Sequence, residues 1–205
     1  HARRLTWSFV DGDSGHTTEQ KKQLALGLAA KLPNLVGLDM DDFFLGNAVP
    51  KTEGGEAPAH LSVEQVRQIQ QELANRKRRL ELSLVLYSHQ LHPAIQRHLE
   101  NVDVVYFWTW QARDLSALER NFAAYRKINP TGRTRLGIYM WDFGAGQPIS
   151  TEAVGHQCRL GWQWLSQGQI EGLIFHCTPL CDMNLAVVEW SRKWIARHAS
   201  DRVGG

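Results

Sequence analysis

Short apolar segments alternate with amphipathic ones along the chain, and this alternation constrains the fold more than any other feature of the sequence. Six segments have the length and apolar content of buried strands. They span residues 5–10, 35–41, 82–89, 102–110, 135–141 and 170–177. Strands that are each followed by a helix are typical of a parallel sheet covered by helices, so the sequence predicts the α/β class.

A helix is expected after nearly every one of these strands. The first helix opens at Thr17 or Thr18, and leucines recur every four residues on one of its faces, at Leu24, Leu28 and Leu32. We expect this leucine face to cover the sheet. The later helices are expected to open at Ser62, where Gln65 completes a capping box, and at Pro93, Ser116, Ser150 and Asn184.

Two architectures fit this alternation, a doubly wound open sheet and a β/α barrel. No predicted strand is followed by a GxGxxG or GxxxxGKS/T loop, so a nucleotide-binding open sheet is disfavoured and no cofactor is expected. Polar and aromatic residues gather where the strands end, which is where a β/α barrel builds its site. We therefore predict a single (β/α) barrel domain over residues 1–205, with six strand–helix units of an incomplete eight-unit TIM-type barrel that lacks its first two units. A six-stranded open sheet is the alternative.

The composition argues against several kinds of partner. The 205 residues carry a formal net charge of +2 and no long block of like charge, so nucleic-acid binding is not expected. No apolar run approaches the roughly 20 residues of a membrane-spanning helix, so no membrane partner is expected. Cys158, Cys177 and Cys181 lack the paired spacing of a structural zinc site and are expected to be free thiols. The sequence predicts no oligomeric state.

The second predicted strand ends in a cluster of aspartates. If Val36, Leu38 and Met40 face the helices, the alternation of side chains along a strand directs Asp39 and Asp41 to the opposite face. Two neighbouring carboxylates favour different protonation states, so one can act as an acid while the other stays charged, as cleavage of a glycosidic bond requires. The alternative is that one aspartate caps the following loop or pairs with an arginine.

Aromatic and polar side chains at the other strand ends are candidates for sugar binding. A flat ring packs on the C–H face of a sugar, and a histidine can bond a hydroxyl group. The candidate substrate-binding residues are Asp11, Tyr87, His89, Trp108, Trp110, Tyr139, Trp141 and His176. The structural alternatives are that the tryptophans fill the core, that the histidines are satisfied structural groups, and that Asp11 belongs to an Asp-Gly turn.

Asp142 is a further candidate for catalysis. It follows Trp141 at a predicted strand end and precedes the stretch Phe143-Gly144-Ala145-Gly146, whose glycines suit a flexible substrate loop. We therefore expect Asp142 to be the best second acid outside the Asp39–Asp41 pair.

The segment Val36-Gly37-Leu38-Asp39-Met40-Asp41 resembles part of the DGxDxDxE strand motif of chitinase-like family 18 glycoside hydrolases. The match is partial, because Val36 stands at the leading aspartate and Phe43 stands at the final glutamate, the proton donor. The resemblance implies a β/α barrel that acts on glycosidic bonds, but it does not transfer the family's substrate-assisted mechanism. With two units missing, the aspartates would lie on barrel strand four, as in that family.

These residues support one leading hypothesis and two alternatives. The leading hypothesis is a glycoside hydrolase with a carbohydrate substrate, in which Asp41 is the general acid and Asp39 its electrostatic partner or nucleophile, with interchangeable roles. The first alternative is a metal-dependent hydrolase that uses Asp39, Asp41, His89 and His176. The second is a carbohydrate-binding barrel without catalysis, which the absence of a glutamate at Phe43 favours.

Overall fold

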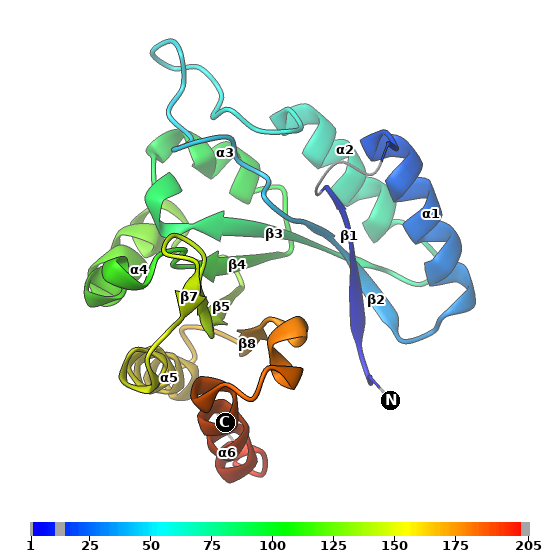
Figure 1. The fold of residues 1–205 in the computed structure, drawn as a ribbon. Coiled ribbons are helices and arrows are strands. Elements are labelled where there is room, and N and C mark those ends of the chain that lie inside the picture. The colour runs from blue at the N-terminus through cyan, green and yellow to red at the C-terminus, as the bar shows by residue number, and fades with distance from the viewer. Residues whose placement is uncertain (1, 11–14, 202–205) are drawn as a thin grey trace. The chain divides into compact units, whose positions relative to one another are not determined.

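The computed structural model describes residues 2–10 and 15–201 of the chain, in which strands and helices alternate (Figure 1). The main strands are β1 (Leu5–Val10), β2 (Leu35–Met40), β3 (Glu81–Tyr87), β4 (Val104–Trp108), β5 (Thr134–Tyr139) and β8 (Gly172–His176), and the helices are α1 (Thr18–Lys31), α2 (Val63–Ala74), α3 (Gln96–Leu99), α4 (Leu118–Ile128), α5 (Thr151–Ser166) and α6 (Ala186–His198). The short elements are the strands β6 (Trp141–Asp142) and β7 (Gln147–Pro148) and the 3₁₀ helices η1 (Ser88–Gln90), η2 (Pro93–Ile95), η3 (Ala112–Ala117) and η4 (Thr178–Asp182).

The six main strands form one sheet in the order β1-β2-β3-β4-β5-β8. Each strand therefore lies beside the main strand that precedes it in the chain, and a helical segment connects the two. Six parallel strands in sequential order are the arrangement of an incomplete (β/α) barrel, so the predicted fold class is confirmed. Within the described residues, no helix is long and apolar enough to cross a membrane.

The chain divides into two compact units. The first contains His1–Leu86, Gln90–Tyr106 and Arg126–Gly132, and the second contains Tyr87–His89, Phe107–Tyr125 and Arg133–Gly205. In the first unit, the parallel register pairs Leu38 with Leu82 and Met40 with Leu84. These four side chains are fully buried, and they share one face of the sheet.

Helix α1 corrects one sequence-based expectation. The helix begins after Thr17, as the sequence predicts, and Thr17 and Gln20 form a capping box there, but the leucine face does not cover the sheet. The buried residues of α1 are Lys22, Ala25, Leu26 and Ala29, whereas Leu24 is 59% exposed and Leu32 is 39% exposed. The alanines bring the helix close to the strands because they are small, and this turns the leucines to the flank.

Helices α2 and α5 begin at the positions that the sequence predicts, whereas α4 and α6 begin two residues later than expected. Helix α2 begins after the Ser62–Gln65 capping box and buries Val66, Ile69 and Leu73. Helix α5 begins after Ser150, whose side chain accepts a hydrogen bond from the backbone of Ala153. The helices expected at Ser116 and Asn184 begin two residues later, at Leu118 and Ala186, and Ser116 itself lies in η3.

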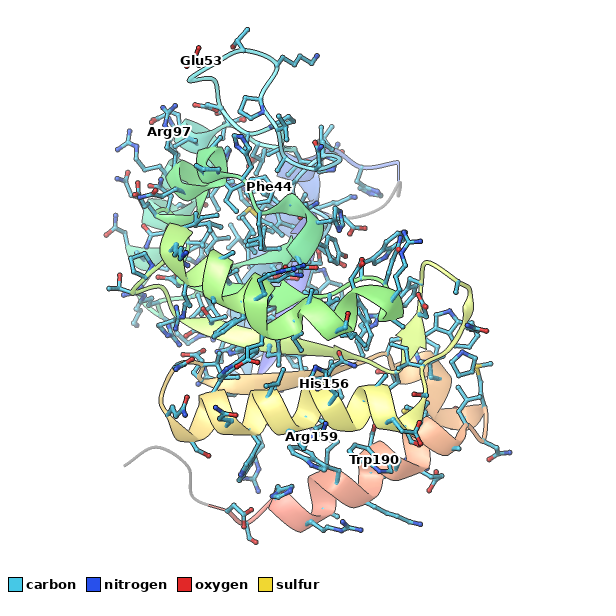
Figure 2. All side chains as sticks on the ribbon, turned by 90° about the vertical axis from the view of Figure 1, so that its left-hand side faces the viewer. Phe44, Glu53, Arg97, His156, Arg159 and Trp190 are labelled. Atoms are coloured by element: carbon cyan, nitrogen blue, oxygen red, sulfur yellow. The ribbon has the colours of Figure 1, made fainter. Side chains whose placement is uncertain are left out.

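In the second unit, the face of the sheet opposite the strand-end candidates is packed by rings from the helices. Phe107 of β4 stacks on Tyr125 of α4 with ring centroids 5.0 Å apart, and Phe122 of α4 stacks on Trp164 of α5 at 4.0 Å. Figure 2 shows His156 and Arg159 on different sides of α5, with Trp190 on the neighbouring helix α6. His156 contacts the backbone oxygen of Leu115 at 3.2 Å. Helix α5 is therefore held on more than one side.

Candidate functional site

Asp39 and Asp41 lie together at the carboxyl end of β2. Asp39 is within the strand, and Asp41 is in the turn that follows it. The turn continues through Asp42, whose backbone is left-handed with φ of 46°. The Oδ1 atom of Asp41 accepts a hydrogen bond from the backbone N–H of Asp42 at 2.9 Å. Both carboxylates are half-buried, so they combine protein contacts with access to solvent.

A serine from the neighbouring strand holds the carboxylate of Asp39. Ser83 of β3 is the register partner of Asp39, and its hydroxyl donates to Oδ1 of Asp39 at 2.9 Å. On the other side, Ser8 of β1 is paired with Asp39 in the register and donates to the backbone oxygen of Val10 at 3.2 Å. Ser8, Asp39 and Ser83 thus form a polar row on the face opposite Leu38 and Met40. Ser83, which is only 1% exposed, is not among the residues that the sequence predicts for the site.

Four rings gather at the strand ends of the second unit. Trp108 of β4 lies 4.5 Å from Tyr139 of β5 and 5.8 Å from His176 of β8, measured between ring centroids. Phe143 lies 5.0 Å from Tyr139 and 5.9 Å from His176. We call Trp108, Tyr139, Phe143 and His176 the aromatic cluster.

The floor of the aromatic cluster depends on a glycine. A Cβ atom at Gly137 would lie 1.9 Å from Cδ2 of Trp108, so the indole lies directly on the backbone of β5. Trp108 and Tyr139 are 5% and 6% exposed, whereas Phe143 is 38% exposed. The two buried rings therefore support a partly open one, and the open ring is the member of the cluster that sequence analysis had not assigned to binding.

A second group of rings contains three of the remaining candidates, Tyr87, His89 and Trp110. Tyr87 and His89 are stacked with centroids 5.5 Å apart, and His89 lies 6.3 Å from Trp110. Trp110 is 37% exposed, which suits a surface platform. Trp141 is half-buried and lies in β6, separated from β5, so it does not continue the side-chain alternation of Tyr139 as expected.

Burial favours the neutral form of both candidate histidines. Desolvation lowers the pKa of His176 below its usual range. Desolvation also lowers the pKa of His89, and the nearby Asp114 carboxylate opposes part of that effect. A neutral imidazole can donate one hydrogen bond and accept another, which is the pattern that a sugar hydroxyl matches.

Two buried polar atoms at the end of β4, one of them in the aromatic cluster, lack a partner among the described residues. These are Nε1 of Trp108 and Oγ1 of Thr109. A buried donor without an acceptor costs free energy, on the order of 1–3 kcal/mol, unless water or a ligand supplies the bond. The end of β4 therefore offers unused hydrogen-bonding capacity.

Asp142 has a local structural contact. It is 8% exposed and lies in the hairpin formed by β6 and β7. Its Oδ1 atom accepts hydrogen bonds from the backbone N–H groups of Gly144 at 3.0 Å and Ala145 at 3.2 Å. The carboxylate thereby fixes the turn that carries Phe143.

The remaining predictions from the sequence concern Asp11, a metal site and the cysteines. Asp11 lies outside the described residues. Among residues 2–10 and 15–201, no group of three or more His, Cys, Asp or Glu side chains could hold a metal ion. Asp39, Asp41, His89 and His176 therefore do not form such a group in the structure. All three cysteines are free.

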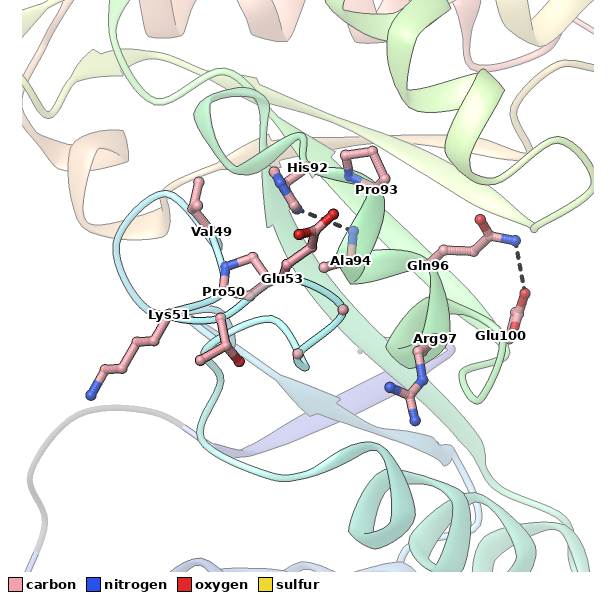
Figure 3. Close-up of a pocket in the computed structure, with 13 residues that line it drawn as sticks. Val49, Pro50, Lys51, Glu53, His92, Pro93, Ala94, Gln96, Arg97 and Glu100 are labelled. Atoms are coloured by element: carbon pink, nitrogen blue, oxygen red, sulfur yellow. Dashed lines mark hydrogen bonds between the residues drawn. The ribbon is translucent and has the colours of Figure 1, made fainter.

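A cavity of about 670 Å³ lies elsewhere in the first unit, between residues 49–55 and the segment that contains His92 and Arg97 (Figure 3). None of the predicted site residues lines it. Nδ1 of His92 accepts a bond from the backbone of Ala94 at 3.2 Å, and Gln96 donates to Glu100 at 2.9 Å. Because these polar groups are already paired, the cavity gives no specific indication of a ligand.

The fold is similar to those of two solved structures. One is a candidate alpha-L-fucosidase from Bacteroides thetaiotaomicron VPI-5482, with a TM-score of 0.57 and 9% sequence identity. The other is the PgaB (BpsB) glycoside hydrolase domain from Bordetella bronchiseptica, with a TM-score of 0.50 and 18% identity. Each match covers 88% of this chain but 62% of the other, so the chain spans less than two thirds of their length.

These matches establish the barrel-type fold and leave the reaction to be argued from the residues. No protein-family model and no curated protein sequence matches the chain. The resemblance of residues 36–41 to the family 18 motif therefore stays a prediction.

Proposed function

We propose that the chain is the larger part of a glycoside hydrolase barrel in which Asp39 and Asp41 act on the glycosidic bond. The observation that carries the proposal is the pair of half-buried carboxylates at the carboxyl end of β2, one of them held by Ser83 at 2.9 Å. Parallel β/α folds build their sites at this end of the strands. The fold likeness to a candidate alpha-L-fucosidase and to a glycoside hydrolase domain supports a carbohydrate substrate.

The contacts of the two aspartates suggest different roles. The Ser83 hydroxyl fixes the orientation of Asp39, which suits a group that acts as a nucleophile or through its negative charge. Asp41 lies in the turn that follows β2, beyond the end of the strand that contains Asp39. This position suits the general acid that protonates the leaving oxygen. The aromatic cluster and Trp110 supply flat rings for sugar binding in the second unit.

Substitution of the aspartates tests this proposal. Asp39→Asn and Asp41→Asn should each lower the rate of glycan hydrolysis by about 10² to 10⁴, because each removes an acid, base or nucleophile from the reaction. Asp42→Asn is the matched control, since Asp42 is the exposed neighbour in the same turn and should keep activity. The rates would be measured on a panel of oligosaccharides, with thermal melting to verify folding. Activity that survives both of the first two substitutions would contradict the proposal.

A carbohydrate-binding barrel without catalysis is the second candidate function. Phe43, which stands at the family 18 glutamate position, is fully buried and packs on Phe44 at 4.9 Å and on His98 at 5.5 Å. This position is therefore part of the core and offers no proton donor. Calorimetry that detects glycan binding, combined with no turnover of the same glycan, would favour this second function.

A further inference from the structure

Positive charge gathers at the end of the first unit where β1, β2 and β3 begin. Residues 2–6, 29–36 and 74–80, which lead into these strands, contain no Asp or Glu. They contain seven of the chain's Lys and Arg residues: Arg3, Arg4, Lys31, Arg76, Lys77, Arg78 and Arg79. Because the whole chain has a formal net charge of only +2, its other residues together carry −5. The near-neutral total therefore conceals a strongly basic end.

Hydrogen bonds to the backbone bring these three segments together. The side-chain amide of Asn34 donates to the backbone oxygen of Ala2 at 3.0 Å, and the backbone N–H of Leu5 donates to the backbone oxygen of Asn34 at 2.8 Å. Nη1 of Arg78, in the loop between α2 and β3, donates to the backbone oxygen of Leu35 at 2.6 Å. Figure 1 shows β1 and β2 starting on the same side of the first unit, where α1 ends. Cations that are far apart in the sequence thus share one surface.

Arg78 has a structural role at this end. Its guanidinium also donates to the backbone oxygens of Ala29, Leu32 and Pro33, the last at 3.1 Å. These carbonyls lie at the end of α1, where the last turn of a helix leaves carbonyls without an intrahelical partner and a cation is favourable. Because Arg78 meets this need of α1, the neighbouring cations of the loop are free of it.

The other six cations fall into two groups. Arg4 pairs with Glu81 at 3.6 Å, and Arg79 pairs with Asp103. Within residues 2–10 and 15–201, the side chains of the other four have no ion-pair or hydrogen-bond partner; these are Arg3, Lys31, Arg76 and Lys77. Arg76 is half-buried and the other three are exposed. Their charges are therefore available to an anionic partner.

A groove of about 650 Å³ lies among these cations, between the end of α1 and the loop before β3. Arg76 and Lys77 line it on the loop side, and Ala29 and Ala30 line it on the helix side. The alanine side chains are small and leave the groove open, while the guanidinium and ammonium groups supply donors that suit carboxylate or sulfate groups. A recessed site of this kind admits a narrow anionic chain, whereas a lipid bilayer presents a flat surface.

We propose that this groove, together with Arg3 and Lys31 of the adjoining segments, binds an acidic polysaccharide through the carboxylate or sulfate groups of its sugars. The choice of a carbohydrate rests on the proposed function, and the choice of an acidic one rests on the four unpaired cations. The groove lies at the amino end of β2, whereas the aspartates lie at its carboxyl end. A strand rises about 3.3 Å per residue, so about 20 Å separates Leu35 from Asp41. The groove is therefore a second binding site, which holds the polymer away from the point of cleavage.

Binding to dextrans that differ in charge would test this site. Dextran sulfate and carboxymethyl dextran should bind, with an affinity that falls about tenfold or more between about 50 and 200 mM salt, whereas neutral dextran should not bind. The double variant Arg76→Ala, Lys77→Ala should weaken binding to both acidic dextrans about tenfold, because it removes the two cations that line the groove. The matched control is Lys51→Ala, Lys193→Ala, which loses the same charge at two exposed lysines outside the three segments. Calorimetry would measure the affinities, and thermal melting would verify folding.

Equal affinity for charged and neutral dextran would overturn the proposal, and so would a double variant that binds like the control. Tighter binding to anionic phospholipid vesicles or to duplex DNA at the same salt concentration would also overturn it, because the surface would then belong to a membrane or a nucleic acid. Binding is measured without turnover, so it would stand even if neither Asp39 nor Asp41 proved catalytic. Conversely, hydrolysis of a neutral oligosaccharide without binding of acidic dextrans would contradict only this second site.

Discussion

At the residue scale, the hydrogen-bond donors around a carboxylate determine whether it can act on a substrate or serves a structural role. Asp39 is held by the hydroxyl of Ser83, which comes from the next strand. Asp142 receives two backbone N–H groups from its own turn and is 8% exposed. The first arrangement is compatible with chemistry on a substrate, whereas the second is a structural contact within one hairpin.

Gly137 is predicted to be essential for the aromatic cluster. In Gly137→Ala, the new Cβ would overlap the Trp108 indole, since the distance to Cδ2 would be 1.9 Å. The ring must move, and we expect a loss of about 1–3 kcal/mol in the free energy of unfolding together with weaker glycan binding. Gly172→Ala on β8 is the control, because its Cβ would be 3.7 Å or more from Arg135. Chemical denaturation would measure both, and equal stabilities would contradict the prediction.

His98 is predicted to make stability depend on pH. It is fully buried, contacts the Leu61 backbone oxygen at 3.2 Å, and packs against Phe43 and Phe44. Burial lowers the pKa of His98, and Arg97 acts in the same direction, whereas the Leu61 contact and Glu56 oppose the shift. The unfolded chain therefore binds a proton on His98 more readily than the folded chain does.

The sign of this effect follows from linkage. The stability associated with neutral His98 is fully present above the unfolded pKa of about 6.5 and is lost as the pH falls below it. The melting temperature should thus decline more steeply between about pH 6.5 and 5 in the wild type than in His98→Gln, which cannot titrate. Identical slopes for the two proteins would show that His98 is not responsible.

At the element scale, the β6–β7 hairpin places one residue of the aromatic cluster. Phe143 reaches Tyr139 and His176 because the chain reverses at Gly144 to Gly146, and Gly146 adopts φ of 66°. The backbone N–H of Gly146 closes the turn by donating to the backbone oxygen of Asp142 at 2.8 Å. The hairpin is therefore a small, internally bonded element that presents a ring.

Two substitutions at Asp142 separate a positioning role from a catalytic one. Asp142→Asn keeps the Oδ1 acceptor and should retain both stability and glycan hydrolysis. Asp142→Ala leaves the N–H groups of Gly144 and Ala145 without that acceptor, and it should cost about 1–3 kcal/mol and weaken glycan binding. Denaturation and calorimetry would measure these changes. If Asp142→Asn abolished hydrolysis at unchanged stability, Asp142 would be a catalytic acid instead.

At the scale of the whole molecule, the fold class is that of a β/α barrel, and the chemistry is proposed to rest on carboxylates alone. Because the carboxylates of Asp39 and Asp41 carry the proposed reaction, we predict that treatment with EDTA followed by desalting leaves glycan hydrolysis within about twofold of the untreated protein. Restoration of lost activity by a divalent cation, but not by a monovalent one, would favour the metal-dependent alternative.

The sequence alone determined the order of the elements and much of their burial. Apolar alternation identified the six main strands, because buried strands must carry aliphatic side chains wherever they face helices. It also placed Leu38 and Met40 on the buried face and Asp39 on the opposite one. Local hydrogen bonds set the starts of α1 and α2, so these starts could be predicted from neighbouring residues.

Only the tertiary structure decided which faces meet and which polar groups pair. Periodicity shows that Leu24, Leu28 and Leu32 share a side of α1, but the close approach of Ala25 and Ala29 to the strands determined that this side lies at the flank. The bond from Ser83 to Asp39 joins two strands separated by 44 positions. Such contacts depend on the register between strands, and no local pattern in the sequence encodes that register.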